Sequence, residues 1–229
     1  MPRLVFPAHE IVGTLRWEDS TDGVDKVALA TGVVVVPERV EVTLKASWME
    51  SVRAGDTLGA VPTKPGEGSK AADLLHDNTG SGSGRITEPG PMNLRFLSQL
   101  PADSITTLQL DFSVAPESFS AVTHLAAGLR WLYLGWTGLD DAALGSVAQL
   151  RRLVYLQTWG NRFTDGGVQQ LAALQNLEAL YLEEKSLSAR AFEFASHLPQ
   201  LARLGIKDVP MSADERSRLK AELPGVDVG

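Results

Sequence analysis

Leu129-Arg-Trp-Leu-Tyr-Leu134 is followed 24 residues later by Leu153-Val-Tyr-Leu-Gln-Thr158 and, after the same interval, by Leu177-Glu-Ala-Leu-Tyr-Leu182. The pattern also occurs one interval earlier, from Ile105 to Leu110, and one interval later, from Leu201 to Ile206. Five such phrases at an unbroken 24-residue period indicate one supersecondary unit that stacks on copies of itself. Each phrase predicts a short extended strand.

A second apolar pattern, with three-residue spacing, follows each phrase by about ten residues. Such a stripe is typical of the inner face of a helix. Each unit is therefore predicted to run strand, turn, helix and loop, with the strands as parallel neighbours and the helices on the other side. The clearest stripes are Leu144, Val147 and Leu150, then Val168, Leu171 and Leu174, then Phe192, Ala195 and Leu198.

The chain divides into three predicted zones. Residues 1–48 have strand character, and we predict a β-hairpin between Val27–Val36 and Val40–Ala46 that caps the first unit. Residues 49–91 are rich in Gly, Pro and Ser, which predicts a flexible loop. Residues 92–229 form the repeat array, whose first, degenerate unit has a helix at Leu94–Leu100 and a strand expected from the hairpin.

The array resembles the leucine-rich repeat family in its 24-residue bacterial form, in which units run Leu-x-x-Leu-x-Leu-x-x-Asn/Thr-x-Leu-x-Asp. The best matches run from Leu129 to Asp141 and from Leu153 to Gly167. The resemblance implies an α/β solenoid with parallel strands on the concave side and helices on the convex side. It also implies that Thr137 and Asn161 hydrogen-bond the backbone where the strands turn away.

Charge and composition exclude several classes of function. A net charge of −7 and a pI near 5.1 argue against nucleic acid as the main partner, because phosphate binding needs clustered Lys and Arg. The chain has no cysteine, and its sequence contains neither a signal-peptide core nor an 18-residue apolar run. We therefore expect a cytoplasmic protein that does not enter a membrane.

No motif in the sequence predicts catalysis or a cofactor. Gly80-Ser-Gly-Ser-Gly84 lacks the Lys-Ser/Thr ending and the strand–helix context of a phosphate-binding loop. The four histidines have no second ligand at metal-binding spacing. Asp140-Asp141 and Asp165 stand where the repeat pattern places a helix N-cap, which explains these carboxylates without chemistry. We expect a protein that is not an enzyme and that carries no cofactor or metal.

The residues between the leucines are predicted to point outward on the concave face, because side chains alternate along a strand. All three tyrosines of the chain and three of its five tryptophans fall on or beside this face. Their rings are expected to be largely exposed to solvent, with Asp111, Glu183, Glu184 and Asp208 as an acidic rim. The candidate binding residues are Trp131, Tyr133, Trp136, Tyr155, Gln157, Trp159, Tyr181, Glu183 and Arg203.

A contiguous exposed aromatic surface usually marks a partner site, since Tyr and Trp dominate binding energy. This favours recognition of a protein or peptide, with basic residues matched to the acidic rim. Three alternatives stay open from the sequence. The same rings would suit a carbohydrate or small molecule, the N-terminal zone would bury them if it folded over the face, or an enzyme site would lie in the N-terminal zone.

Overall fold

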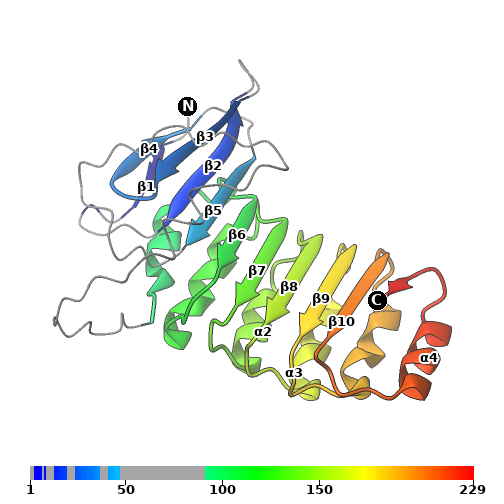
Figure 1. Cartoon of the computed structure of the whole chain (residues 1–229). Coiled ribbons are helices and arrows are strands. Elements are labelled where there is room, and N and C mark those ends of the chain that lie inside the picture. Colours follow the sequence, from blue (N-terminus) through cyan, green and yellow to red (C-terminus); the bar gives the residue numbers. More distant parts are fainter. Residues whose placement is uncertain (1–2, 7, 9–12, 20–23, 37–40, 47–90) are drawn as a thin grey trace, which may run out of the picture.

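The computed structural model describes residues 3–6, 8, 13–19, 24–36, 41–46 and 91–229. The predicted flexible loop at 49–91 therefore lies outside the described residues, except for Pro91. The described chain forms a row of strands backed by a row of helices, and the N-terminal strands extend the row at one end (Figure 1).

Nine strands form one mixed sheet, in the order β11-β10-β9-β8-β7-β6-β5-β2-β3. The five strands of the repeated phrases, β6 to β10, pair in parallel with their neighbours, which confirms the pairing predicted from the 24-residue period. The strands are β2 (Thr14–Asp19), β3 (Val24–Leu29), β5 (Val42–Ala46), β6 (Thr107–Leu110), β7 (Trp131–Gly135), β8 (Tyr155–Trp159), β9 (Ala179–Glu183), β10 (Arg203–Lys207) and β11 (Asp227–Val228).

One column of leucines crosses this sheet in register. Leu132 lies in register beside Leu156, and Leu156 lies beside Leu180, so these leucines follow one another from coil to coil. All are fully buried on the helix side, so the register places the largest apolar side chains in one continuous core. The column consists of Leu15, Leu44, Leu108, Leu132, Leu156, Leu180, Leu204 and Val228.

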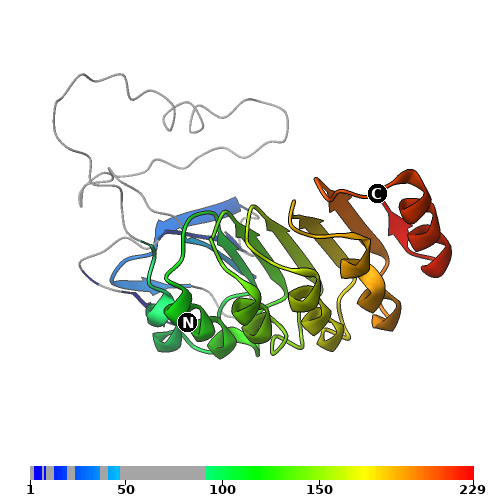
Figure 2. The same cartoon turned by 90° about the horizontal axis from the view of Figure 1, so that it is seen from below.

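The other face of each coil is helical, but most of it is 3-10 helix rather than α-helix. A 3-10 helix has three residues per turn, so apolar residues spaced by three lie on one side and enter the core together. Phe119, Val122 and Leu125 of η2 do so, and all three are buried. The helices are η1 (Leu94–Gln99), η2 (Pro116–Leu125), α2 (Asp141–Val147), α3 (Asp165–Val168), η3 (Gln169–Ala173), η4 (Ala189–His197) and α4 (Ala213–Glu222); Figure 2 shows them together on one side of the sheet.

The N-terminal zone pairs differently from the predicted hairpin. Val27–Val36 is split at Gly32, whose φ of 58° breaks the strand, so its second half forms β4 (Val33–Val35) and pairs with β1 (Arg3–Val5). Strand β5 lies between β2 and β6 instead, where Leu44 joins the leucine column. The strand that completes the degenerate first unit thus comes from the N-terminal zone.

The small β1–β4 sheet packs against the first helix of the array. The rings of Phe6 and Phe96 lie 6.1 Å apart, and both side chains are buried. Because Phe96 belongs to η1, this sheet covers the helix side of the first unit. The described N-terminal strands therefore lengthen the main sheet or cover its helix side. None of these described strands accounts for the partial burial of the tyrosine side chains on β7, β8 and β9.

Polar side chains tie each coil to the next. Asp140 caps α2 as predicted, accepting from the Ala142 amide at 3.1 Å. For Asp165 the cap prediction is wrong: Thr164 caps α3, and Asp165 accepts from the amide of Ser188 at 2.8 Å in the following coil. Asp141 does the same with the Thr164 amide, also at 2.8 Å. These carboxylates therefore act as links between units.

The turn prediction is confirmed for Asn161. Its side-chain amide donates to the carbonyls of Leu134 and Trp159, at 3.0 and 3.2 Å. The hydroxyl of Thr137, which is fully buried, donates to the Asn161 side-chain oxygen rather than to the backbone. Asn161 thus fastens two neighbouring strand ends.

Replacing Leu156 by Ala should lower the free energy of unfolding by about 2–5 kcal/mol, because it opens a cavity in the middle of the leucine column. Lys185→Ala, at an exposed position of the same region, should change it by less than about 0.5 kcal/mol. Urea denaturation followed by circular dichroism measures both. Equal effects of the two substitutions would contradict the observed register.

Candidate functional site

The face of the main sheet that points away from the helices, here called the strand face, carries eight of the nine candidate residues, and the ninth, Trp136, directly follows β7 at its edge. Trp131 lies in register beside Tyr155, and Tyr133 lies beside Gln157. Gln157 in turn lies beside Tyr181. Their side chains stand on this face because the leucines between them point to the core. The candidate residues other than Trp136 therefore lie side by side on β7, β8, β9 and β10.

The three tyrosines form a ladder, and we use this name for Tyr133, Tyr155 and Tyr181. The Tyr133 and Tyr155 ring centroids lie 5.0 Å apart with planes inclined by 37°, and those of Tyr155 and Tyr181 lie 5.5 Å apart with planes inclined by 34°. Tyr155, in the middle strand, therefore has a ring neighbour on each side. Its hydroxyl donates to the Gln157 side-chain oxygen at 2.8 Å, which fixes the ring further.

The ladder favours neutral tyrosines. Burial raises the pKa of Tyr133. Burial also raises the pKa of Tyr155 to about 12, helped by repulsion from the charged forms of Tyr133 and Tyr181 and opposed by Arg203. Arg203 lies at the end of the ladder, with its guanidinium 3.5 Å from the Tyr181 hydroxyl. Both shifts favour the neutral phenol form of Tyr133 and Tyr155.

Two tryptophans, Trp136 and Trp159, make an edge-to-face contact beyond the ladder, and we call them the tryptophan pair. Their centroids lie 5.9 Å apart, and the ring planes are nearly perpendicular at 87°. A Cβ on Gly135 would lie 2.2 Å from the Trp159 ring, and one on Gly160 would lie 2.4 Å from the Trp136 ring. Each indole therefore rests on a glycine of the neighbouring coil.

The backbone of Trp136 adopts a left-handed conformation, with φ at 46°. Bulky side chains rarely adopt it, and the equivalent residue one coil later is a glycine, Gly160, with φ at 69°. The side chain of Trp136 is nevertheless 66% exposed. Asp208, three intervals after Trp136, also has a positive φ, at 58°, so this backbone conformation recurs in the array, and at Trp136 it presents an exposed indole.

The expectation that these rings are largely exposed to solvent is wrong for most of them. Trp131, Trp159 and the ladder are half-buried, and within the ladder neighbouring rings cover one another. Trp136 is largely exposed, and so is Phe112 at the same position one coil earlier, at 53%.

Sequence reasoning missed the glycines beneath the rings. Gly135 and Gly160 support the tryptophan pair, and Gly205 lies under Tyr181, where a Cβ would come within 2.2 Å of the ring. A signal for the pair was present: Gly135-Trp136 and Trp159-Gly160 are inverted dipeptides one 24-residue period apart.

The acidic rim is partly neutralised by ion pairs on the strand face. Glu183, which lies in register beside Trp159, binds Lys207 at 2.7 Å. At the other end Asp111 binds Lys45 at 3.3 Å. Asp208 is exposed, so the rim is a mixed border of both charges.

Glu184 does not belong to the rim, because its side chain is buried in the turn after β9. Its carboxylate accepts from the Asn161 backbone amide at 2.7 Å and from the Asn161 side-chain amide at 3.1 Å. Burial raises the pKa of Glu184, the hydrogen bonds from Asn161 lower it, and the nearby charge of Glu183 raises it. Glu184 therefore supports the turn that carries Trp159 and Gly160.

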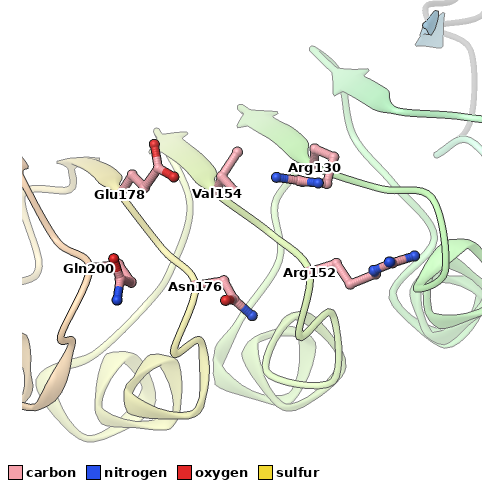
Figure 3. Close-up of a pocket in the computed structure, with 6 residues that line it drawn as sticks. All are labelled: Arg130, Arg152, Val154, Asn176, Glu178 and Gln200. Atoms are coloured by element: carbon pink, nitrogen blue, oxygen red, sulfur yellow. The ribbon is translucent and has the colours of Figure 1, made fainter. Parts of the chain in front are cut away.

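A separate polar pocket of about 220 Å³ lies at the opposite ends of the same strands (Figure 3). Arg130, Val154 and Glu178 directly precede β7, β8 and β9, whereas Trp136 follows β7. Behind them lie Arg152, Asn176 and Gln200, and Arg152 donates to the Ala127 carbonyl at 2.6 Å. This pocket contains no aromatic residue.

The described residues contain no group of three or more His, Asp or Glu side chains placed to hold a metal ion. None of the helices in the described ranges has the length and apolar character that a membrane span requires.

The chain is similar to internalins and to a leucine-rich repeat protein of known structure. Internalin C2 of Listeria monocytogenes is 26% identical with a TM-score of 0.47, and the match covers 60% of this chain and 55% of that chain. A leucine-rich repeat protein of Leptospira interrogans is 20% identical with a TM-score of 0.42, and the match covers 61% of this chain and 34% of that chain.

The internalin inlF of Listeria monocytogenes is 19% identical with a TM-score of 0.42, and the match covers 59% of this chain and 43% of that chain. The chain thus spans about half, or less, of the length of these proteins. Neither the family models nor the curated proteins gave a match.

The tyrosine ladder predicts a pH dependence of stability. Between the ordinary tyrosine pKa of about 10 and the value of about 12 for Tyr155, the unfolded chain loses a proton that the folded chain keeps. The free energy of unfolding should therefore fall as pH rises through this interval, and it should fall less steeply in Tyr155→Phe. Urea denaturation at stepped alkaline pH measures both slopes, and equal slopes would contradict the ladder.

Trp136→Gly should leave the free energy of unfolding within about 1 kcal/mol of the original value. Relief of the left-handed backbone, about 1–2 kcal/mol, offsets the lost ring contact with Trp159, about 0.5–1.5 kcal/mol. Thermal and urea denaturation check this balance. A loss above about 2 kcal/mol would mean that the indole is a packing element.

Proposed function

We propose that this chain is a non-catalytic scaffold that recognises a protein or peptide through its strand face. The contact surface comprises the tyrosine ladder, the tryptophan pair, and the charged side chains at either end, Lys45–Asp111 and Glu183–Lys207. Binding buries rigid rings against the partner, and the charged border orients it.

The observation that carries this proposal is the pre-arrangement of the rings. Tyr155 is held by two ring neighbours and by Gln157, so little side-chain freedom remains to be lost on binding. Trp136 is held by Gly160 and Trp159 while most of its surface faces solvent. Rigid aromatic side chains that are already ordered are typical of binding hot spots.

The ladder favours a polypeptide over a sugar as the ligand. Sugar rings stack on exposed aromatic faces, whereas both sides of Tyr155 are occupied by other tyrosines. The ladder therefore presents ring edges and hydroxyl groups, which suit backbone and side-chain groups of a protein. The exposed indole of Trp136 favours carbohydrate binding as the second candidate, because it still offers a free ring face.

A selection experiment tests the proposal without a known partner. A displayed library of random peptides is selected on the immobilised chain, and the affinities of selected peptides are measured against variants. The double substitution Tyr155→Ala and Trp159→Ala should weaken binding about a thousandfold, since each hot-spot ring contributes at least about 2 kcal/mol. Glu193→Ala, on the exposed surface of η4, should have no effect.

Circular dichroism and urea denaturation establish whether the double variant folds. If it does not, Trp136→Gly provides the same test at a ring that contributes little to the core. Selected peptides that bind all variants equally would contradict the proposal. Binding of oligosaccharides in place of peptides, lost in Trp136→Gly, would support the carbohydrate alternative.

A further inference from the structure

We infer that the angle between Trp136 and Trp159, together with the carboxylate of Glu183, binds an arginine side chain of the partner. The inference rests on the proposed function, because it names the chemical group that the strand face recognises. It concerns one end of that face, where the tryptophan pair and the Glu183–Lys207 ion pair lie on neighbouring strands.

The tryptophan pair forms two aromatic walls. With the indole planes at 87° and their centroids at 5.9 Å, a group placed in the angle touches both rings. Indole is the side chain whose face attracts cations most strongly, because its π-system carries negative potential on both faces. Gly135 and Gly160 hold the walls in place, so the angle exists before any ligand arrives.

A carboxylate stands one strand away. Trp159 and Glu183 are register partners on β8 and β9, so their Cα atoms lie about 4.8 Å apart and their side chains share one face. Glu183 has a side chain that is 32% exposed and therefore accessible. A cation against the Trp159 ring is thus within reach of a full negative charge.

The structure already shows a cation at this carboxylate. The ammonium of Lys207 lies 2.7 Å from Glu183, and the Lys207 side chain is 70% exposed. Exposed ion pairs of this kind contribute little stability. A partner cation that contacts both Glu183 and the indoles therefore gains more interaction free energy than is lost when the Glu183–Lys207 ion pair breaks.

The surroundings favour positive charge. Glu184 is buried one residue further on, and its pKa is raised by burial and also by the charge of Glu183, so the two carboxylates repel each other. A cation beside Glu183 relieves this repulsion. The chain as a whole has a net charge of −7, which attracts basic partners at long range.

Arginine fits this arrangement better than lysine. Its guanidinium is flat, is weakly hydrated, and stacks on an aromatic face while its edge donates hydrogen bonds to a carboxylate. The ammonium of lysine is a compact, strongly hydrated charge without a planar face. The indole rings match the flat face of one guanidinium, and the Glu183 oxygen accepts hydrogen bonds from its edge.

The test uses three blocked tripeptides, Gly-Arg-Gly, Gly-Lys-Gly and the citrulline analogue of the first, which has nearly the shape of arginine without its charge. Binding to the full chain is followed by the indole N–H resonances of Trp136 and Trp159, assigned from Trp136→Gly and Trp159→Phe. The arginine peptide should shift both resonances and bind at least about fivefold tighter than the citrulline peptide. The lysine peptide should fall between them.

Substitutions separate the contributions. Glu183→Gln should weaken the arginine peptide, and Lys207→Ala should tighten it by removing the internal competitor. Neither should affect the citrulline peptide. Arg16→Ala, which breaks an exposed ion pair with Asp25 between β2 and β3, is the matched control and should change nothing.

Equal binding of the arginine and citrulline peptides would overturn the inference, and so would weaker arginine binding in Lys207→Ala. Unchanged indole resonances of Trp136 and Trp159 at a saturating concentration of the arginine peptide would also overturn it. Because these measurements need no selected partner, they stand apart from the library experiment. If the affinity of the library-selected peptides did not depend on Tyr155 and Trp159, the proposed function would be wrong. If the tripeptides bound without regard to their charge, only the arginine site would be wrong.

Discussion

The leucine column that crosses the main sheet is the contact on which the other features depend. Each of Leu108, Leu132, Leu156, Leu180 and Leu204 faces its equivalent in the next coil and is fully buried. A shift of one residue in β7, β8 or β9 would turn the leucines of that strand to solvent and its aromatic side chains inward. The burial of the leucines therefore decides which side chains occupy the strand face.

The sequence predicted the parts of the fold that follow from periodicity. Strands β6 to β10 and their parallel order were predicted because each coil must return its leucine to the same column. The 3-10 character of η2 and η4 was not predicted, because the same three-residue spacing also occurs at Leu144 and Val147 of α2, which is an α-helix. The pairing of the N-terminal strands was mispredicted because Val27–Val36 lies outside the 24-residue repeat, so no repeated pattern indicates its neighbour. The interruption of this segment depends on the local backbone conformation of Gly32.

The candidate site was predictable in position but not in geometry. Alternation on a strand places Tyr133, Tyr155 and Tyr181 on one face, and the structure puts them there. Mutual coverage of the rings depends on side-chain angles, which no spacing rule contains. The role of Glu184 was also hidden, since its neighbour Glu183 is accessible whereas Glu184 turns inward to Asn161. Only the fold distinguishes these two adjacent residues.

The 3-10 helices have a consequence for the curvature of the strand face. Parallel strands repeat about every 4.8 Å, whereas packed α-helices need about 8–10 Å, and this mismatch bends a stacked array around its strand side. A 3-10 helix is narrower than an α-helix, so η2, η3 and η4 reduce the mismatch in their coils. The strand face over these coils is therefore expected to be flatter than it would be over α-helices alone.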